Sequence, residues 1–399
     1  MTEPTPTLRL VFLDWLRIIA FALLVPYHVG MYYVGWSWHV KSPHAGPGLE
    51  PWMLLSSPWR MSLLFVVSGA ATSLMLRGRA ADAAWLGGRL KRLALPLLAG
   101  MALIVPPQSY FEVVQFHGYA GGYTDFLTLY FGGSGSFCRP GRGCLLLPTW
   151  NHLWFLPYLM LYTLALWAVL RRWPDALDRA ARRAGPMLGG TSLLLLPLAW
   201  LLLTLALLRP LFPPTHALLD DAFLHAQYAA LFGLGAVLAR APEAWPAFTA
   251  QRWLALSLAV AGWSLLVSDA PPAARGFGAT LSQWGAIVAA IGFAHRHLRV
   301  DGPWRRRLTA AVFPLYVLHQ SVIVVGAMAL APLRLAPGVE GVILIVCTFA
   351  ACAALTALAG RVHPLRPWLG IHDPADDPGP RRAPAPSAAA IPGRGGSRT

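Results

Sequence analysis

Residues 10–33 read LVFLDWLRIIAFALLVPYHVGMYY, and this apolar run decides the fold. About 20 helical residues, each rising ~1.5 Å, cross the ~30 Å hydrocarbon core of a bilayer, so the run predicts a transmembrane helix. It nevertheless contains Asp14, Arg17 and His28. Ionisable side chains are costly inside a membrane and generally face a bundle interior or a wet cavity. We therefore expect this helix to carry functional residues.

The spacing of these residues places them on one helix face. His28 follows Arg17 by eleven positions, which at about 100° per residue returns it to within roughly 20° of Arg17, ~16 Å farther along the axis. Asp14 precedes Arg17 by three positions, so we expect the two to pair. Pro26 lacks an N–H group and should loosen the helix beside His28, which favours a cavity around the imidazole.

Similar apolar runs recur along the chain of 399 residues. Hydrophobic residues make up 56% and charged residues 12%, and the mean hydropathy is +0.52, which is typical of a polytopic membrane protein. We predict an all-α transmembrane bundle with about ten spans, over 10–33, 54–76, 93–114, 153–170, 192–208, 222–238, 253–267, 277–294, 308–330 and 339–359. The span over 253–267 is the shortest of these and ends before the polar, proline-containing stretch 268–272.

The basic residues predict the orientation of the bundle. Of the 32 lysines and arginines, 24 lie in the segments that ten spans would put on the side of the two termini, so both termini are expected to be cytoplasmic. This asymmetry explains the formal charge of +15 without a nucleic-acid partner. Residues 1–369 would form one membrane domain. Residues 370–399, rich in Pro, Gly, Ala and Arg, would form a disordered cytoplasmic tail.

His28 is the leading candidate for chemistry, because a near-neutral imidazole can take a proton from an attacking hydroxyl and return it. The competing interpretation is a histidine hydrogen-bonded to a neighbouring helix.

Arg60 would lie in the second span, where a guanidinium needs an anion, a carbonyl group or water. It either binds substrate or extends to the membrane surface. Gly69, in the same span, permits close helix contact or leaves room for an acyl chain.

Polar residues in three other spans are further candidates. Arg89 and Arg92 are three positions apart and suit a phosphate group, although basic residues also flank spans on the cytoplasmic side. Trp154 begins the fourth span and would stack on a sugar or belong to an interfacial aromatic belt. Tyr316 and His319 lie inside the ninth span, where their polar atoms need partners.

The sequence contains no ligand spacing typical of a metal site and no glycine-rich phosphate loop. Cys138 and Cys144 bracket a short stretch of a predicted outer loop. An oxidising compartment would allow a disulfide there, and the sequence leaves that pairing open.

The chain resembles the acyltransferase 3 family of integral membrane acyltransferases, particularly its glucans biosynthesis protein C branch, a group of glucan succinyltransferases. The resemblance is carried by LDWLRIIAFALLVPYHVGMYY, WRMSLLFVVSGA, RLKRLALP, HLWFLPYLMLY and FPLYVLHQ, in that order. The family's R-x10-H signature falls on Arg17 and His28, and its R-x-x-R signature falls on Arg89 and Arg92.

The resemblance implies transfer of a succinyl or acetyl group from cytoplasmic acyl-CoA to a carbohydrate hydroxyl outside the bacterial inner membrane, without a metal. It implies that Arg89 and Arg92 bind the CoA phosphates, and that Arg17 either contacts the same cofactor or is fixed by Asp14. His28, assisted by Arg17, would be a general base for direct transfer or a transient carrier of the acyl group, and both routes stay open. The residues expected to orient the substrates are Arg60, Trp154, Tyr316 and His319.

A transporter without covalent chemistry is the alternative. Intramembrane His, Arg and Asp residues also form proton relays and anion sites, so a proton- or anion-coupled carrier would use the same residue types. Many transporters are built from two related halves, and no such halves are visible here. The acyl group, the glycan acceptor and the oligomeric state are left open.

Overall fold

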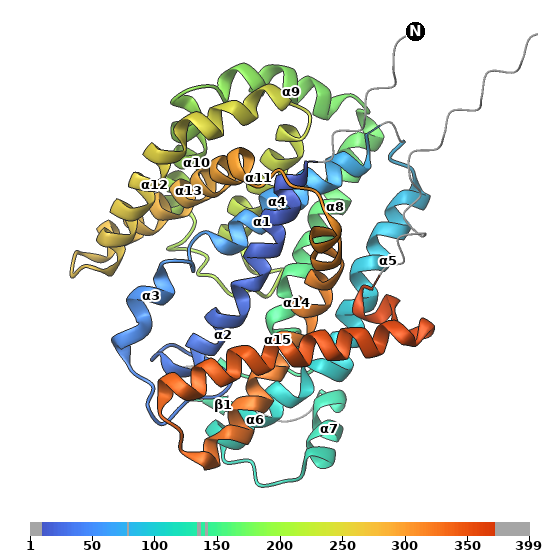
Figure 1. Cartoon of the computed structure of the whole chain (residues 1–399), viewed down its shortest axis with the longest axis vertical. Helices are drawn as coiled ribbons and strands as arrows, with labels where there is room; N and C mark the ends of the chain where they lie inside the picture. Colours follow the sequence, from blue (N-terminus) through green and yellow to red (C-terminus); the bar gives the residue numbers. More distant parts are fainter. Residues whose placement is uncertain (1–9, 78–79, 134–136, 140–142, 372–399) are drawn as a thin grey trace, which may run out of the picture.

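The structure is a computed structural model that describes residues 10–77, 80–133, 137–139 and 143–371. The predicted disordered tail, 370–399, lies outside these residues except for its first two positions. Helices make up almost all of the regular secondary structure of the described residues (Figure 1). Their α-helices are α1 (Val11–Ala22), α2 (Leu24–Tyr33), α3 (Glu50–Leu54), α4 (Arg60–Met75), α5 (Ala83–Ala99), α6 (Pro106–His117), α7 (Tyr123–Gly132), α8 (Phe155–Arg172), α9 (Ala176–Met187), α10 (Ser192–Leu207), α11 (Ala222–Leu238), α12 (Trp245–Val267), α13 (Pro272–His297), α14 (Pro303–Leu330) and α15 (Pro337–Arg361).

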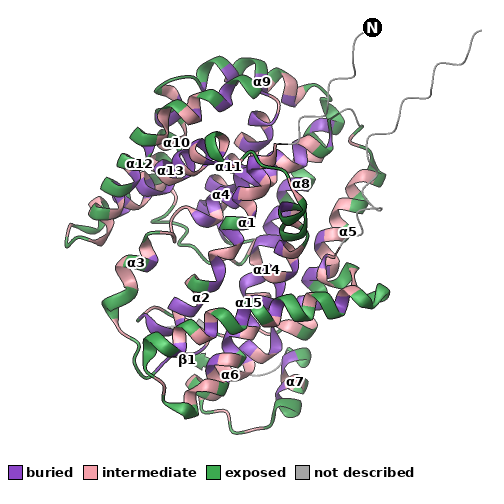
Figure 2. Cartoon of the chain, viewed as in Figure 1, coloured by how far each residue is buried: buried purple, intermediate pink, exposed green. Residues whose placement is uncertain are grey.

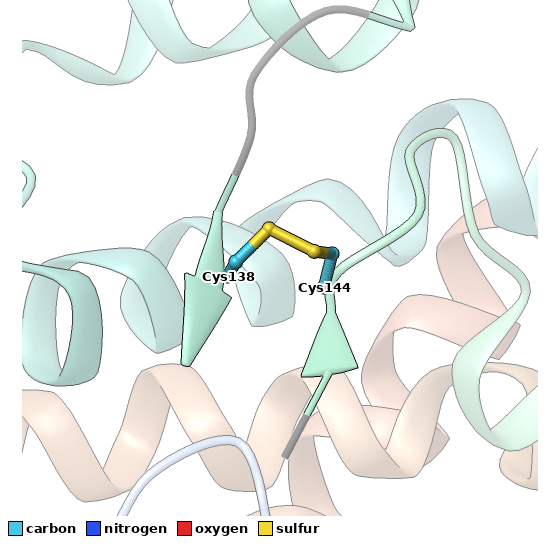
Figure 3. Close-up of a disulfide and its surroundings, with 2 residues drawn as sticks. All are labelled: Cys138 and Cys144. Atoms are coloured by element: carbon cyan, nitrogen blue, oxygen red, sulfur yellow. A yellow bond between two sulfur atoms is a disulfide. The ribbon is translucent and has the colours of Figure 1, made fainter. Parts of the chain in front are cut away.

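Short elements join these helices. The π-helical turn η2 (Gly100–Ile104) lies between α5 and α6, and one antiparallel ribbon is formed by β1 (Cys138–Arg139) and β2 (Gly143–Cys144). The 3₁₀ turns are η1 (Pro47–Leu49), η3 (Asn151–Trp154), η4 (Pro242–Ala244), η5 (Ala331–Leu333), η6 (His363–Leu365) and η7 (Pro367–Leu369). A disulfide joins Cys138 to Cys144 across the ribbon, so the pairing that the sequence left open is present (Figure 3).

The predicted all-α fold is confirmed, and most of the predicted spans coincide with helices that could cross a membrane. Six helical segments among the described residues are long and apolar enough, and the number is eight if each of two bent helix pairs is one span. The two remaining predictions, 54–76 and 222–238, coincide with the shorter apolar helices α4 and α11, of 16 and 17 residues. The weak prediction over 253–267 belongs to a longer segment, Pro242–Val267.

The first predicted helix has a break at its centre. α1 ends at Ala22 and α2 begins at Leu24, and together they form a membrane-length segment of 23 residues. Pro26 offers no N–H group to the carbonyl of Ala22, which is the reason for the break that its position predicted. The break, at Leu23, lies between Arg17 and His28.

The helices cross closely where glycines face one another. A Cβ on Gly69 of α4 would lie 1.9 Å from the carbonyl oxygen of Phe232 in α11, and one on Gly235 would lie 1.9 Å from that of Val66. Such contacts are possible only without side chains, as in many membrane helix pairs. The close helix contact expected at Gly69 is therefore confirmed.

Buried residues gather where the helices face one another, and large apolar residues remain exposed on the outside (Figure 2). On α10 the exposed residues include Leu203 and Leu207, and on α15 they include Val342 and Val346. An apolar exterior of this extent fits a surface that contacts lipid.

Replacing Gly235 by Ala should destabilise the crossing of α4 and α11, because the new Cβ meets a backbone oxygen that cannot rotate away. Overpacking of this kind costs roughly 1–3 kcal/mol, so the unfolding midpoint of the purified protein in detergent should fall. A Cβ added to Gly233, on the same helix, would have nothing within 4 Å of it, and Gly233→Ala should unfold at or above the wild-type temperature. Equal midpoints for the two variants would contradict the close crossing.

Candidate functional site

A cavity with a volume of about 630 Å³ lies among α2, α4, η3, α11, α13 and α14. Its walls come from segments that are far apart in the sequence, so the cavity exists only in the folded bundle. Five of the residues predicted from the sequence line it, and they are His28, Arg60, Trp154, Tyr316 and His319. The structure therefore brings together the candidate base and all of the predicted substrate-binding residues.

His28 and His319 form a direct contact across the cavity wall. The Nε2 atom of His319 lies 3.0 Å from Nδ1 of His28, and the ring centroids are 4.9 Å apart. His28 Nδ1 is also 3.0 Å from the carbonyl oxygen of Leu24, one turn earlier in α2. The indole of Trp38 lies nearly parallel to the His28 ring at a centroid distance of 6.4 Å. The imidazole is thus held by two helices and one loop.

Arg60 supplies a buried positive charge to the same cavity. It is only 4% exposed, its guanidinium lies 3.7 Å from the centre of the Tyr27 ring, and its Nη1 donates to Ser56 Oγ at 3.1 Å. The Nε atom of Arg60 is buried without a hydrogen-bond partner among the described residues. Stacking on an aromatic ring compensates only part of the cost of burying a guanidinium. Arg60 therefore has unused capacity to bind an anion.

The permanent charges that line the cavity are positive. They belong to Arg60 and Arg209; five histidines also line the cavity, and no aspartate or glutamate does so in the described parts of the chain. His39, at the edge, pairs with Glu112 at 2.5 Å. A cavity of this composition favours an anionic or polar guest over a cationic one.

One wall is a network of amides that the sequence reasoning missed. Gln108 donates to Ser321 Oγ at 2.6 Å and accepts from Gln320 at 2.9 Å and from Asn151 at 3.2 Å. His152 joins this wall through a contact between its Nε2 and the carbonyl oxygen of Val317 at 3.0 Å. Glutamines inside apolar runs were the available signal, because a buried amide needs partners from other helices.

A second buried amide pair comes from α11 and α13. Gln283 of α13 donates to Ser62 Oγ at 2.8 Å and to Gln227 Oε1 at 3.2 Å, and Gln227 donates to Thr204 Oγ1 at 3.3 Å. Both glutamines line the cavity. Two walls therefore present fixed amides, a chemistry suited to hydroxyl groups.

Aromatic rings form another part of the lining. Trp154 stacks against Tyr228 at a centroid distance of 5.8 Å and contacts the ring of His216 at 4.3 Å. His216 belongs to the loop before α11, and burial lowers the pKa of its imidazole, which therefore stays neutral at pH 7. Tyr316 also lines the cavity, but its hydroxyl donates to the carbonyl oxygen of His152 at 2.9 Å. The Tyr316 hydroxyl therefore makes a hydrogen bond within the protein.

The three arginines predicted to bind the cofactor form a separate group. Arg17, Arg89 and Arg92 do not line the cavity, and the charges of Arg17 and Arg92 both act on Arg89. Within the described ranges none of the three forms an ion pair, and Arg89 Nε is buried without a hydrogen-bond partner. The ring of Phe21 lies between the two sites, 5.9 Å from Arg17 and 5.3 Å from the Tyr316 ring.

The expected pairing of Asp14 with Arg17 is wrong. Asp14 instead forms an ion pair with Arg305 of α14, whose guanidinium is 1% exposed and also contacts Asp301 at 2.8 Å. Asp14 is still close enough to attract Arg17. Spacing along one helix could not reveal a stronger partner on another helix.

No group of three or more His, Cys, Asp or Glu residues is placed to hold a metal ion in the part of the chain that the structure describes.

Comparison with known proteins gives the chain its family. The acyltransferase domain of the acyltransferase 3 family matches residues 10–357. Glucans biosynthesis protein C of Escherichia coli SMS-3-5 is 33% identical over 175 residues, which are 42% of this chain and 41% of that protein. The protein of the same name from Escherichia coli K12 is 31% identical over 171 residues, with the same coverage. The alignments thus span about two fifths of these relatives, and no solved structure matches the chain. Because the family match covers most of its length, the chain belongs to the acyltransferase 3 family.

Proposed function

We propose that this acyltransferase moves an acyl group from cytoplasmic acyl-CoA to a carbohydrate hydroxyl on the opposite side of the bacterial inner membrane, with His28 as the group that handles the proton. The observation that carries the proposal is the imidazole of His28 in the wall of a cavity that also contains a buried guanidinium, Arg60. A base and an anion-binding group facing one enclosed space are what acyl transfer requires.

The orientation rests on the basic residues. If the side with 24 of the 32 lysines and arginines is cytoplasmic, both termini and the Arg17, Arg89 and Arg92 group face the cytoplasm. Acyl-CoA is polyanionic, and three guanidiniums without ion-pair partners in the described residues suit its phosphates. His28 would then lie ~16 Å deeper along the first helix. The acyl end of the donor would have to pass the contact between Phe21 and Tyr316 to reach it.

The proton and the acyl group follow a balanced path. In direct transfer His28 takes the proton of the acceptor hydroxyl while the hydroxyl oxygen attacks the thioester carbonyl carbon. The tetrahedral intermediate then expels the CoA thiolate, which receives the proton from His28, so an ester and a thiol are formed. In the second route the imidazole nitrogen attacks the thioester carbonyl carbon and expels the CoA thiolate, which takes the ring proton of the acylated His28 and leaves as the thiol. The acceptor hydroxyl then attacks the acyl carbon, its oxygen forms the ester, and its proton passes to the released imidazole. Both routes use the same nitrogen.

A glycan acceptor is supported by the lining and by the relatives. Trp154 offers an aromatic face, and Gln227, Gln283 and Gln320 offer amides for hydroxyl groups. The relatives from Escherichia coli are named for glucan biosynthesis. The acyl group that fits Arg60 is one with a free carboxylate, since a guanidinium binds a carboxylate with charge-assisted hydrogen bonds. Succinyl is such a group, and acetyl is not.

The function is tested by adding labelled acyl-CoA to the cytoplasmic face of oriented vesicles and measuring the label on carbohydrate at the other face. His28→Ala should reduce the transfer rate by roughly 10²–10⁴-fold, because removal of a general base costs about that much. His297→Ala, at the exposed end of α13, is the matched control and should transfer normally. Equal transfer by His28→Ala would make His28 structural. Absence of turnover in the wild type, with proton or anion flux in the same vesicles, would establish the transporter alternative.

The donor site is tested by the double variant Arg89→Ala/Arg92→Ala. It should raise the KM for acyl-CoA by roughly 10- to 100-fold, because two charge-assisted phosphate contacts are lost. Lys91, exposed on the same helix between them, gives the matched control Lys91→Ala, which should leave KM within about twofold of wild type. If Lys91→Ala raises the KM for acyl-CoA as much as the double variant does, the rise reflects the general surface charge of the helix, and Arg89 and Arg92 are not a specific phosphate site.

The acyl group is tested by comparing succinyl-CoA with acetyl-CoA as donors. Arg60→Met should lower kcat/KM for succinyl-CoA by roughly 10- to 100-fold relative to acetyl-CoA, because only succinyl loses an ionic contact. Arg60→Lys keeps the charge and should retain part of the preference. An equal loss with both donors would sink the carboxylate assignment and leave Arg60 with a structural role.

A further inference from the structure

We propose that His319 is a positioning residue, which holds the imidazole of His28 in the tautomer that leaves its Nε2 lone pair free for the substrate. This inference rests on the proposed function, because it is His28 that acts as the base. It changes the role expected of His319 from a contact with substrate to a contact with the catalytic ring.

The tautomer of His319 follows from its neighbours. Its Nδ1 lies 2.8 Å from the carbonyl oxygen of Tyr316 and 3.2 Å from that of Leu315. Carbonyl oxygens only accept hydrogen bonds, so Nδ1 must carry the proton. In the neutral ring Nε2 then holds a lone pair and can only accept.

The tautomer of His28 follows in turn. Its Nδ1 lies 3.0 Å from Nε2 of His319 and 3.0 Å from the carbonyl oxygen of Leu24, and both of these atoms are acceptors. His28 Nδ1 must therefore carry the proton, which leaves the lone pair on Nε2. No described residue hydrogen-bonds that Nε2, and the atom is not fully enclosed by protein, so it reaches open space in the cavity that His28 lines.

The two acceptors of His28 are not equivalent. Leu24 belongs to α2 and moves with His28, whereas His319 belongs to α14 and fixes the ring relative to another wall of the cavity. When His28 takes a proton at Nε2, its Nδ1–H group becomes a cationic donor, and the bond to His319 becomes charge-assisted. In an interior of low dielectric constant such a bond strengthens as the charge develops. The pair therefore orients the base and stabilises its protonated form.

The pair is tested first without acyl transfer, by ¹⁵N NMR of histidine-labelled full-length protein in detergent, with the two signals assigned through His28→Asn and His319→Asn. Nitrogen shifts distinguish protonated from unprotonated ring nitrogens. We expect both His28 and His319 to carry the proton on Nδ1. Finding His28 protonated on Nε2 in the neutral ring would overturn the inference whether or not the protein transfers acyl groups.

The second test is kinetic. His319→Leu removes the acceptor and should lower kcat by roughly 10- to 100-fold with KM within about twofold of wild type. His319→Gln keeps an acceptor oxygen near the position of Nε2 and should restore most of kcat. His297→Leu is the control for the substitution itself. A wild-type kcat in folded His319→Leu would overturn the positioning role, and so would His319→Gln being as impaired as His319→Leu. If His319→Leu does not fold, His319→Gln and the NMR tautomers still decide.

Discussion

A charged or polar side chain inside an apolar bundle needs a partner, and this constraint organises the centre of the molecule. Asp14 of α1 meets Arg305 of α14, and eleven positions after Arg17 the ring of His28 meets His319 of the same α14. The first helical segment and α14 are therefore joined by polar contacts at two levels. The cost of an unpaired charge makes this alignment specific in a way that apolar packing alone would not.

One charged group in the cavity, the guanidinium of Arg60, has no oppositely charged partner among the described residues that line the cavity. Arg60 is buried against the face of Tyr27 without a carboxylate among the described residues that line the space. The glycine crossing between α4 and α11 helps to place Arg60 there, because it packs α4 against the helix that carries Gln227 and Tyr228. Stability and function are thus coupled: the close packing that holds the bundle also fixes a positive charge in its interior.

Much of the fold could be predicted from the sequence, because apolar length reports directly on membrane-spanning helices. The runs containing α1, α2, α13, α14 and α15 were recognised in this way. The reasoning was weaker for α4 and α11, which are shorter than a bilayer is thick, and for α12, which begins at Trp245, eight residues before the predicted run. The predicted partner of Asp14 was wrong, because helical spacing describes only neighbours on one helix. It gives no information about Arg305, a partner almost three hundred residues away.

The sequence by itself determined which residues are chemically exceptional: an imidazole, guanidiniums and amides stand out wherever the surrounding run is apolar, since burying them is costly. It also determined that Arg17 and His28 lie about three helical turns apart. Only the tertiary structure decided which of these residues share a space. It put His28, Arg60 and His319 around one cavity, kept Arg17 and Arg89 outside it, and brought ring nitrogens of the two histidines within hydrogen-bond distance of each other. The physical reason is that a hydrogen bond depends on distances of a few tenths of an ångström between helices, and no periodicity within a single helix encodes them.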